Sequence, residues 1–288
     1  MASSSTGAEV ISLPDGRKLA FDLSGPPESP VILLSNSLLS NFRVWDHFVK
    51  VLHSNGFRTL RYDYPGHGHS TTPSDLNSVT LFSLANDVSL LVMAVKLTEV
   101  HAYIGVSMGA SVGLLFAAQN PGFVKKLIFC DGMRRSPLAA GKEDPFGPRI
   151  EIAKAQPDAI ETLTESTLER WFGTAWMNAN IDETERMREI MNTTTRDGYI
   201  ACCNALRDKG NDLSRYLEKA GRNVNAAMLV VGEKDANMPE TMAEMKKDIQ
   251  AGLGSKGTVG WAVIKGAGHL PMIDNSKQFN TEVLNFLT

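Results

Sequence analysis

The chain has 288 residues, of which 43% are hydrophobic and 21% charged, with a formal net charge of −3. This length can bury one large core, which favours a single domain with an insertion over two independent domains. The small negative net charge produces no electrostatic field that would attract nucleic acid or an acidic membrane surface, so we expect neither as a partner. The first residues are small and polar, and no apolar run is long enough to span a bilayer, which predicts a cytoplasmic protein.

Strand-like and helix-like runs alternate through the first 130 residues. A hairpin of Val10–Leu13 and Lys18–Leu23 is expected first, because turn-forming residues separate these runs. Further strands are expected at Val31–Leu34, Thr59–Asp63, Val100–Gly105 and Lys126–Cys130, and helices near Trp45–Ser54, Leu81–Leu97 and Ala110–Gln119. Such alternation predicts an α/β fold with a mostly parallel sheet and helices on both faces.

The pattern changes between residues 133 and 221. Strand-like runs stop, helical spacing dominates, and Pro137, Pro145 and Pro148 interrupt the start of the segment. Strands are expected again at Met228–Gly232 and Gly260–Lys265, and a last helix at Ser276–Leu287. We therefore predict a core domain of residues 1–132 and 222–288, with residues 133–221 inserted as a helical lid, or cap.

A serine lies at the turn between an expected strand and an expected helix. Residues 105–110 read Gly-Val-Ser-Met-Gly-Ala, so glycines flank Ser107 two positions away on either side. In a nucleophile elbow such glycines allow the sharp bend that lifts the hydroxyl out of the sheet, with the serine amide at the start of a helix. The G-x-S-x-G pattern alone is weak, but the strand-turn-helix setting favours a nucleophilic Ser107.

A serine hydroxyl is a poor nucleophile, so the elbow requires a histidine base and an acid that orients it. Asp235 and His269 each follow an expected strand, in the order serine, acid, histidine that the α/β-hydrolase fold uses. We therefore predict Ser107, Asp235 and His269 as a catalytic triad. Asp131 stays open as an alternative acid, because it also follows a strand from which some folds of this class take their acid.

Acyl transfer also needs two backbone amides aimed at the developing negative oxygen. The amide after the nucleophile, that of Met108, supplies one. The second is expected from the loop after the Val31–Leu34 strand, where many proteins of this fold carry His-Gly and this chain has Asn36 and Ser37. Leu38 is therefore the candidate for the second donor.

The remaining histidines and the three cysteines are expected to have structural roles. His67 and His69 lie in a glycine-rich turn and lack further nearby ligands, so we expect them to structure the loop and expect no metal. An odd number of cysteines cannot form a complete set of disulfides. Cys130 is expected at a buried strand end, and Cys202 and Cys203 on a helix of the insertion, as reduced packing residues.

Motifs along most of the chain match one family. They are, in chain order, Ser35–Leu38 with Val44–Asp46, Arg61–Asp63 leading to Gly66–Ser70, Gly105–Gly109, Thr167–Phe172 and Gly198–Asp208. Together they resemble the 3-oxoadipate enol-lactone hydrolases of the α/β-hydrolase superfamily, and the last two resemble that family's lid. The chain departs from the family at Leu39, where glycine is usual, and over Gly132–Arg149, where no motif matches. Both departures lie where a substrate would be recognised.

The resemblance implies a serine hydrolase that opens a small lactone or ester through an acyl-enzyme without a cofactor. Trp171 is expected to line the pocket because it lies in a family-like segment, and Arg134 is a candidate partner for a substrate carboxylate. Other apolar cap residues are expected mainly to pack within the cap: Phe172, Trp176, Met177, Met187 and Met191. Self-association into a homo-oligomer stays open. So do a carboxylesterase, a carbon-carbon bond hydrolase, a specialised biosynthetic enzyme and a ligand receptor that retains the triad.

Overall fold

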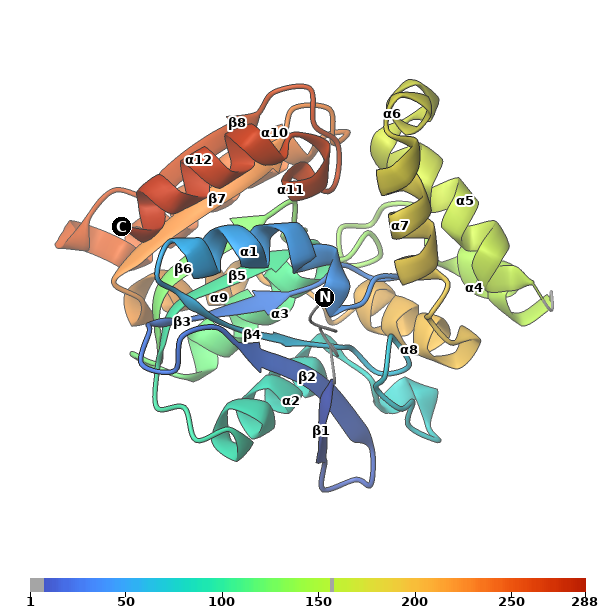
Figure 1. Cartoon of the computed structure of the whole chain (residues 1–288), viewed down its shortest axis with the longest axis horizontal. Helices are drawn as coiled ribbons and strands as arrows, with labels where there is room; N and C mark the ends of the chain where they lie inside the picture. Colours follow the sequence, from blue (N-terminus) through green and yellow to red (C-terminus); the bar gives the residue numbers. More distant parts are fainter. Residues whose placement is uncertain (1–7, 156–157) are drawn as a thin grey trace, which may run out of the picture.

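The computed structural model describes residues 8–155 and 158–288 and is built on one sheet of eight strands (Figure 1). The strands are β1 Glu9–Ser12, β2 Lys18–Ser24, β3 Val31–Ser35, β4 Arg58–Tyr62, β5 Val100–Val106, β6 Val124–Cys130, β7 Ala226–Gly232 and β8 Gly260–Ile264. Their order across the sheet is β1-β2-β4-β3-β5-β6-β7-β8. Only the β1–β2 and β2–β4 pairs are antiparallel. The predicted mostly parallel sheet is confirmed.

Helices cover both faces of the sheet. On one face α1 (Asp46–Ser54) contacts α12 (Ser276–Leu287). The other face carries a row of neighbouring helices, α2 Leu81–Ala94, α3 Met108–Gln119, α9 Ser214–Asn223 and α10 Met238–Leu253. Short helical turns complete the core: η1 Phe42–Trp45, η2 Leu76–Ser78, η3 Gly254–Lys256 and α11 Pro271–Asp274. No helix in the described part of the chain has both the length and the apolar character needed to cross a membrane.

Burial on both faces explains why the central strands were visible in the sequence. Every residue of β3 is buried, and so are all residues of β5 except His101. Strands of a parallel sheet covered on both faces form continuous apolar runs, which is the pattern the sequence shows. Helix α3 is buried from Met108 to Ala118, because it lies between the sheet and its neighbouring helices.

Helix α10 was not predicted from the sequence. Its buried residues are Met242, Met245, Ile249 and Leu253, which recur every three or four positions. This spacing is that of an amphipathic helix. The signal was therefore present between β7 and β8, although the residues between the apolar positions are strongly charged.

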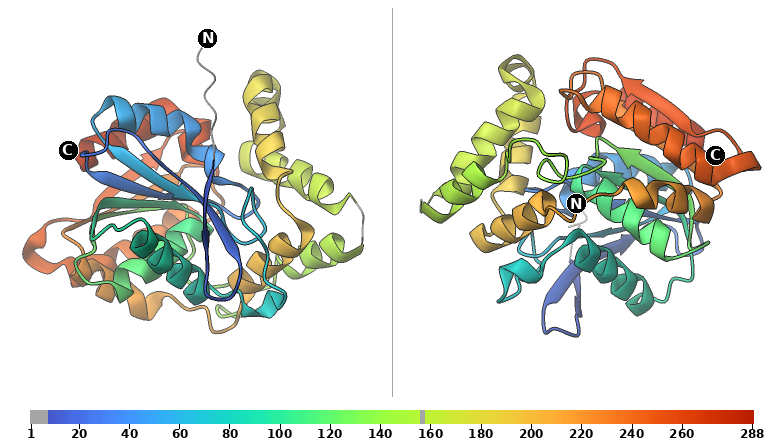
Figure 2. Two further views of the ribbon diagram at one scale, coloured as in Figure 1. Left: turned by 60° about the horizontal axis from the view of Figure 1, so that its bottom comes forward. Right: turned by 180° about the vertical axis from the view of Figure 1, so that it is seen from behind.

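The inserted helices lie to one side of the sheet, as the three views agree (Figures 1 and 2). They are α4 Gly147–Ala155, α5 Ala159–Phe172, α6 Thr174–Ala179, α7 Ile181–Met191 and α8 Arg196–Arg207. Residues 1–7 of the predicted core and 156–157 of the predicted insertion lie outside the described residues. Because α9 packs against α3 and α10, we place the end of the proposed cap before α9.

Candidate active site

Ser107 lies at a tight turn between β5 and α3. Its φ of 58° and ψ of −117° are strained for a residue other than glycine. A Cβ at Gly105 would lie 2.2 Å from the Gly109 carbonyl oxygen, and one at Gly109 would lie 2.4 Å from the Ser35 carbonyl oxygen. The strand, the helix and the end of β3 can approach this closely only because both positions are glycine.

Asp235 and His269 meet across the loops that follow β7 and β8. His269 Nδ1 lies 2.8 Å from Asp235 Oδ2. Burial alone would raise the pKa of Asp235, but the neighbouring His269 outweighs burial and holds this pKa below its usual value. A carboxylate at Nδ1 favours the tautomer that carries its proton there, which leaves Nε2 free to accept a proton.

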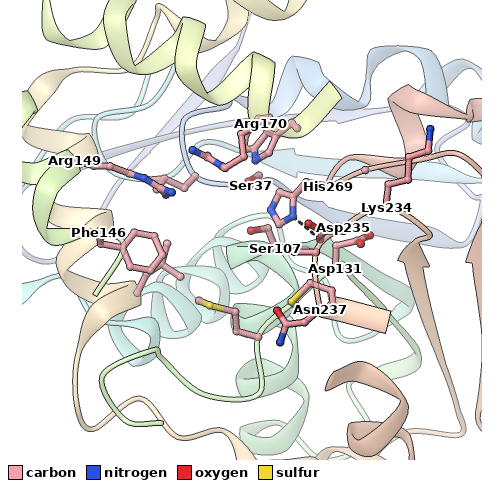
Figure 3. A pocket seen from close by; sticks show the side chains of 17 residues that line it. Ser37, Ser107, Asp131, Phe146, Arg149, Arg170, Lys234, Asp235, Asn237 and His269 are labelled. Carbon is pink, nitrogen blue, oxygen red and sulfur yellow. Dashed lines mark hydrogen bonds and ion pairs between the residues drawn. The ribbon is translucent and has the colours of Figure 1, made fainter. Parts of the chain in front are cut away.

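Both loops open into the cavity that also contains the serine. Ser107, Asp235 and His269 line one cavity of about 400 Å³. In Figure 3 the Ser107 side chain lies beside the imidazole, with Asp235 on the far side of the ring. No hydrogen bond joins the Ser107 hydroxyl to His269 in the described chain. Such bonds are often long in unliganded enzymes and shorten when substrate binds.

Two unpaired backbone donors lie next to the serine. Leu38 belongs to the loop after β3 and lines the cavity, and Met108 is the first residue of α3. Among the described residues neither Leu38 N–H nor Met108 N–H has an acceptor. The Ser37 hydroxyl is buried, lacks a partner in the described chain, and belongs to the same cavity wall. In the sequence Ser37 stands out only as a departure from His-Gly, and no local pattern indicates that it is a polar group of the pocket.

His67 supports this loop from behind. Its Nε2 accepts the Leu39 N–H at 3.1 Å, and its Nδ1 donates to the Pro65 carbonyl at 2.9 Å. Complete burial lowers the pKa of His67 to about 4, so the ring is neutral and Nε2 can act as an acceptor. Leu39 has a φ of 63°, a conformation that glycine would adopt with less strain. His67 therefore holds a strained loop next to Leu38.

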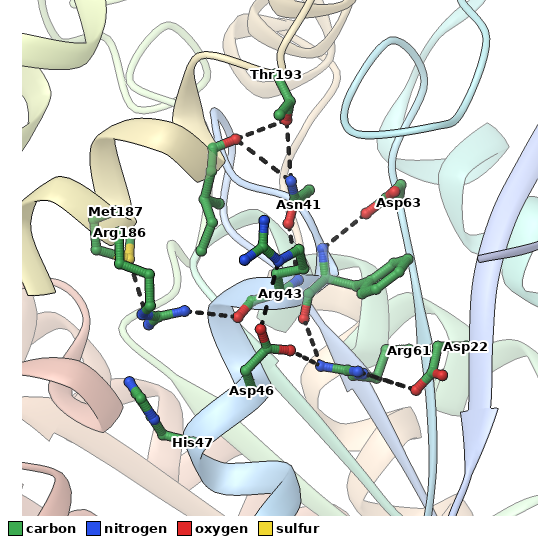
Figure 4. A network of polar contacts seen from close by, with 12 residues as sticks. Asp22, Asn41, Arg43, Asp46, His47, Arg61, Asp63, Arg186, Met187 and Thr193 are labelled. Carbon is green, nitrogen blue, oxygen red and sulfur yellow. Dashed lines mark hydrogen bonds and ion pairs between the residues drawn. The ribbon is translucent and has the colours of Figure 1, made fainter. Parts of the chain in front are cut away.

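A polar network continues from this loop to the cap (Figure 4). Asn41 Nδ2 donates to Thr193 Oγ1 at 3.0 Å, which joins the loop to the turn after α7. Asp63 Oδ1 accepts the Phe42 N–H at 2.7 Å. The loop that carries Leu38 is thus held from both the core and the cap.

We expect His67→Phe to lower the rate of Ser107 labelling by a fluorophosphonate about 10-fold, because a buried N–H without an acceptor costs roughly 1–3 kcal/mol. The Leu39 N–H loses its acceptor and the loop with Leu38 is free to shift. His69→Phe is the matched control, since the His69 side chain is exposed. Equal labelling rates for both variants and the wild type would show that His67 does not position the loop.

Helix α5 provides an apolar wall above His269. The Trp171 ring stacks on the imidazole, with 5.5 Å between ring centroids and 27° between ring planes. A Cβ at Gly268 would lie 2.1 Å from the Trp171 carbonyl oxygen, so the end of α5 approaches the histidine loop closely. Trp171 lines the cavity. The other cap residues singled out in the sequence, including the fully buried Met187 and Met191, are not part of this cavity wall.

Arg134 does not reach the cavity, which corrects the prediction that it could contact a substrate carboxylate. Its Nη2 donates to Asp248 Oδ2 at 2.6 Å, and its Nε donates to Ser214 Oγ at 3.0 Å. The backbone pairing of Leu213 N–H with the Arg134 carbonyl directs this segment toward α9 and α10. The guanidinium is therefore neutralised by acidic residues of α10.

Arg149 and Arg170 contribute the positive charge that was expected from Arg134. Both line the cavity, and in Figure 3 both extend toward the space next to Ser107. In the described chain neither guanidinium forms an ion pair; Arg149 lies over the Phe146 ring at 5.6 Å. Desolvation and the charge of Arg149 lower the pKa of Arg170 to about 10. Two cations thus face the cavity, and neither has an anionic partner among residues 8–155 and 158–288.

Comparisons with known proteins agree with this architecture. A family model described as the alpha/beta hydrolase fold matches residues 30–276. 3-Oxoadipate enol-lactonase 1 of Acinetobacter baylyi is 27% identical over 66% of this chain and 68% of its own length. The crystal structure of the enol-lactonase from Burkholderia xenovorans LB400 is 26% identical, with a TM-score of 0.84 over 97% of this chain and 99% of that one.

A second solved structure, a hydrolase from Pseudomonas aeruginosa PA01, is 27% identical, with a TM-score of 0.81 over 98% of this chain and 99% of that one. The resemblance to the enol-lactone hydrolases that the sequence predicted is confirmed by these matches. The family model covers most of the sheet and the whole insertion. The chain belongs to the α/β hydrolase fold family.

Proposed function

We propose that this chain, a hydrolase of the α/β fold, opens a lactone of the 3-oxoadipate enol-lactone kind, or a related small ester, through an acyl-enzyme on Ser107. The observation that carries the proposal is the Asp235–His269 hydrogen bond of 2.8 Å at the cavity that contains Ser107. The strained elbow provides the nucleophile, and the unpaired amides of Leu38 and Met108 are available for an oxyanion.

The proposed reaction has two acyl-transfer steps. His269 Nε2 takes the Ser107 proton while the serine oxygen attacks the carbonyl carbon, and Asp235 stabilises the imidazolium that forms. The ring C–O bond then breaks, the imidazolium gives its proton to the leaving oxygen, and the enol that forms tautomerises to a ketone. Water, deprotonated by the same imidazole, cleaves the acyl-serine ester and releases the acid. No step requires a cofactor.

The unpaired arginines support a substrate that carries a carboxylate. A lactone derived from a dicarboxylic acid retains one free carboxylate after ring closure. Arg149 and Arg170 could hold this group beside Ser107, and charge-assisted hydrogen bonds of this kind are among the stronger polar contacts. Trp171 would cover the ring of the substrate and exclude water from the oxyanion.

We expect Arg170→Gln to raise KM for a carboxylated enol lactone about 10-fold or more, because a hydrogen bond to a charged group contributes roughly 1.5–3 kcal/mol. Hydrolysis of p-nitrophenyl acetate, which has no carboxylate, should change little. Arg135→Gln is the matched control, since Arg135 does not line the cavity. A similar loss on both substrates would assign Arg170 a structural role and remove the argument for an anionic substrate.

A substrate panel separates the proposed reaction from its competitors. Enol lactones, p-nitrophenyl esters and ring-fission diketones are offered to the purified protein, and kcat/KM is compared. The proposal predicts the highest kcat/KM for a carboxylated enol lactone. A preference for simple esters would identify a carboxylesterase, and a preference for diketones a carbon-carbon bond hydrolase. Slow turnover of every substrate by a protein whose Ser107 still reacts with a fluorophosphonate would favour a receptor or a specialised biosynthetic enzyme.

A further inference from the structure

Asp131 is a second acid beside the proposed triad. It follows β6 directly, is 1% exposed, and lines the same cavity wall as Asp235. Its φ of 44° is strained for a residue with a side chain. The Asp131 N–H donates to the Val230 carbonyl at 3.1 Å, and Oδ1 accepts the Gly232 N–H at 2.8 Å. The backbone of β7 therefore fixes this carboxyl group in one orientation.

The other oxygen of Asp131 has no donor. Oδ2 is buried, and no N–H or O–H of the described residues reaches it. The carboxyl of Asp235 lies next to that of Asp131, and its charge helps to raise the pKa of Asp131 (Figure 3). Asp235 Oδ2 is already occupied by His269 Nδ1. Two ionised carboxylates that lie next to each other repel, and the buried Asp131 Oδ2 has no donor to offset its charge, so a single proton on this pair of acids removes the repulsion.

The surroundings assign this proton to Asp131. Burial, followed by the charge of Asp235, raises the pKa of Asp131 well above its usual value, and Asp274 on α11 adds to this effect. Burial raises the pKa of Asp235 too, but His269 outweighs it, with smaller help from Asp131 and Arg170. Two further titratable groups lie nearby and have little influence on which acid carries the proton. Burial raises the pKa of the Cys130 thiol and keeps it neutral, and Lys234 is exposed to solvent.

We propose that Asp131 is a positioning residue that stays neutral and donates its O–H to Asp235, so that the two acids together present one negative charge to His269. The inference rests on the proposed function only in assigning His269 as the base. The Asp131 O–H holds Asp235 in the orientation that His269 Nδ1 requires. Asp131 and Asp235, which the sequence offered as alternatives, thus act together with different roles.

If Asp131 is neutral, Asp131→Asn should have little effect, because an asparagine amide resembles a protonated aspartic acid in shape and polarity. In Asp131→Asn the amide oxygen can still accept the Gly232 N–H, and the amide NH₂ can still donate to Asp235. Fluorophosphonate labelling of Ser107 should proceed within about 3-fold of the wild-type rate, since one neutral donor replaces another. In a plot of the labelling rate of Asp131→Asn against pH, the acidic limb should lie at the same pH as in the wild type.

Asp131→Leu removes the donor while keeping a similar volume. Labelling should slow by about 10- to 100-fold, because a hydrogen bond to a charged acceptor is lost. An Asp235 carboxylate without this donor attracts the His269 imidazolium more strongly, so the acidic limb of the pH profile shifts to higher pH. A purely structural loss would slow labelling without moving this limb.

Two results would overturn the proposal. If Asp131 were ionised, Asp131→Asn would remove a negative charge beside His269 and shift the acidic limb to lower pH. If Asp131 were the orienting acid, Asp131→Asn would slow labelling by about 10⁴-fold, the loss known for a triad acid converted to its amide.

Infrared spectroscopy tests the proton without any need for activity. With aspartate labelled by ¹³C, the difference between the wild-type and Asp131→Asn spectra should contain the carbonyl band of a buried protonated carboxyl. The subtraction removes the contribution of Asp63, whose pKa burial raises to about 7. This measurement does not use Asp131→Leu, so it still tests the proposal if that variant fails to fold. Absence of labelling at Ser107 in the wild type would instead contradict the proposed function, and the infrared band would still decide the state of Asp131. A difference spectrum without the band would overturn the inference.

Discussion

Ser107→Ala is expected to lower kcat by about 10⁶-fold, the size of loss measured when a triad serine is removed. Alanine cannot form the acyl-enzyme, so turnover would depend on direct attack by water. The Ser107 hydroxyl makes no hydrogen bond in the described chain that folding would lose, and its N–H bond to the Cys130 carbonyl is retained. Turnover of an enol lactone and the melting temperature of the same preparation measure the two effects separately.

A neighbouring serine provides the control. Ser111 lies on the same helix, is 1% exposed, and does not line the cavity. Ser111→Ala should therefore keep wild-type turnover. A Ser107→Ala protein that retains most of its activity would refute the assignment of the nucleophile.

Asp235→Asn is expected to lower kcat by about 10⁴-fold. An amide nitrogen facing Nδ1 would favour the wrong imidazole tautomer, and the charge that stabilises the imidazolium would be absent. The 2.8 Å contact between His269 Nδ1 and Asp235 is the geometry on which this loss depends. Steady-state kinetics and the pH dependence of kcat measure it.

The matched control for this variant is Glu240→Gln, which removes a carboxylate from the exposed surface of the nearby helix α10. It should leave kcat unchanged, which separates the loss of the orienting acid from a general change of charge. Asp235→Asn with nearly full activity would show that another acid, with Asp131 the nearest, orients His269.

The chain order of the proposed site could be predicted because each residue follows a strand that is visible as an apolar run. Ser107, Asp235 and His269 come after β5, β7 and β8, which are parallel and end at the same edge of the sheet. Residues that directly follow these strands therefore lie close to one another at that edge of the sheet. The glycines around Ser107 added a local signal that needs no knowledge of the rest of the fold.

The substrate-facing charges could not be predicted in this way. Arg149 and Arg170 lie on cap helices α4 and α5, and nothing in their own sequence indicates which face meets the core. Arg134 was singled out because it follows β6 closely, but acidic residues of α10 neutralise it, and α10 itself was not predicted. Contacts between elements far apart in the chain determine which arginine faces the cavity. The periodicity of a sequence contains no information about such contacts.

The roles of the two acids illustrate the same limit. From the sequence, Asp235 is favoured as the triad acid by its position in the chain, but Asp131 also follows a strand of the parallel sheet and stays open as the alternative. The structure distinguishes them by burial and by partners, because Asp235 meets His269, while the Asp131 carboxyl accepts the Gly232 N–H and lies next to Asp235.

The central claim is that residues 107, 235 and 269 act together as one nucleophilic centre. Fluorophosphonate labelling followed by peptide mass spectrometry tests it most directly, without knowledge of the natural substrate. The account predicts a single adduct on Ser107 in the wild type, and its near-complete loss in His269→Ala. Labelling of a different residue, or an undiminished rate of Ser107 labelling in His269→Ala, would contradict it.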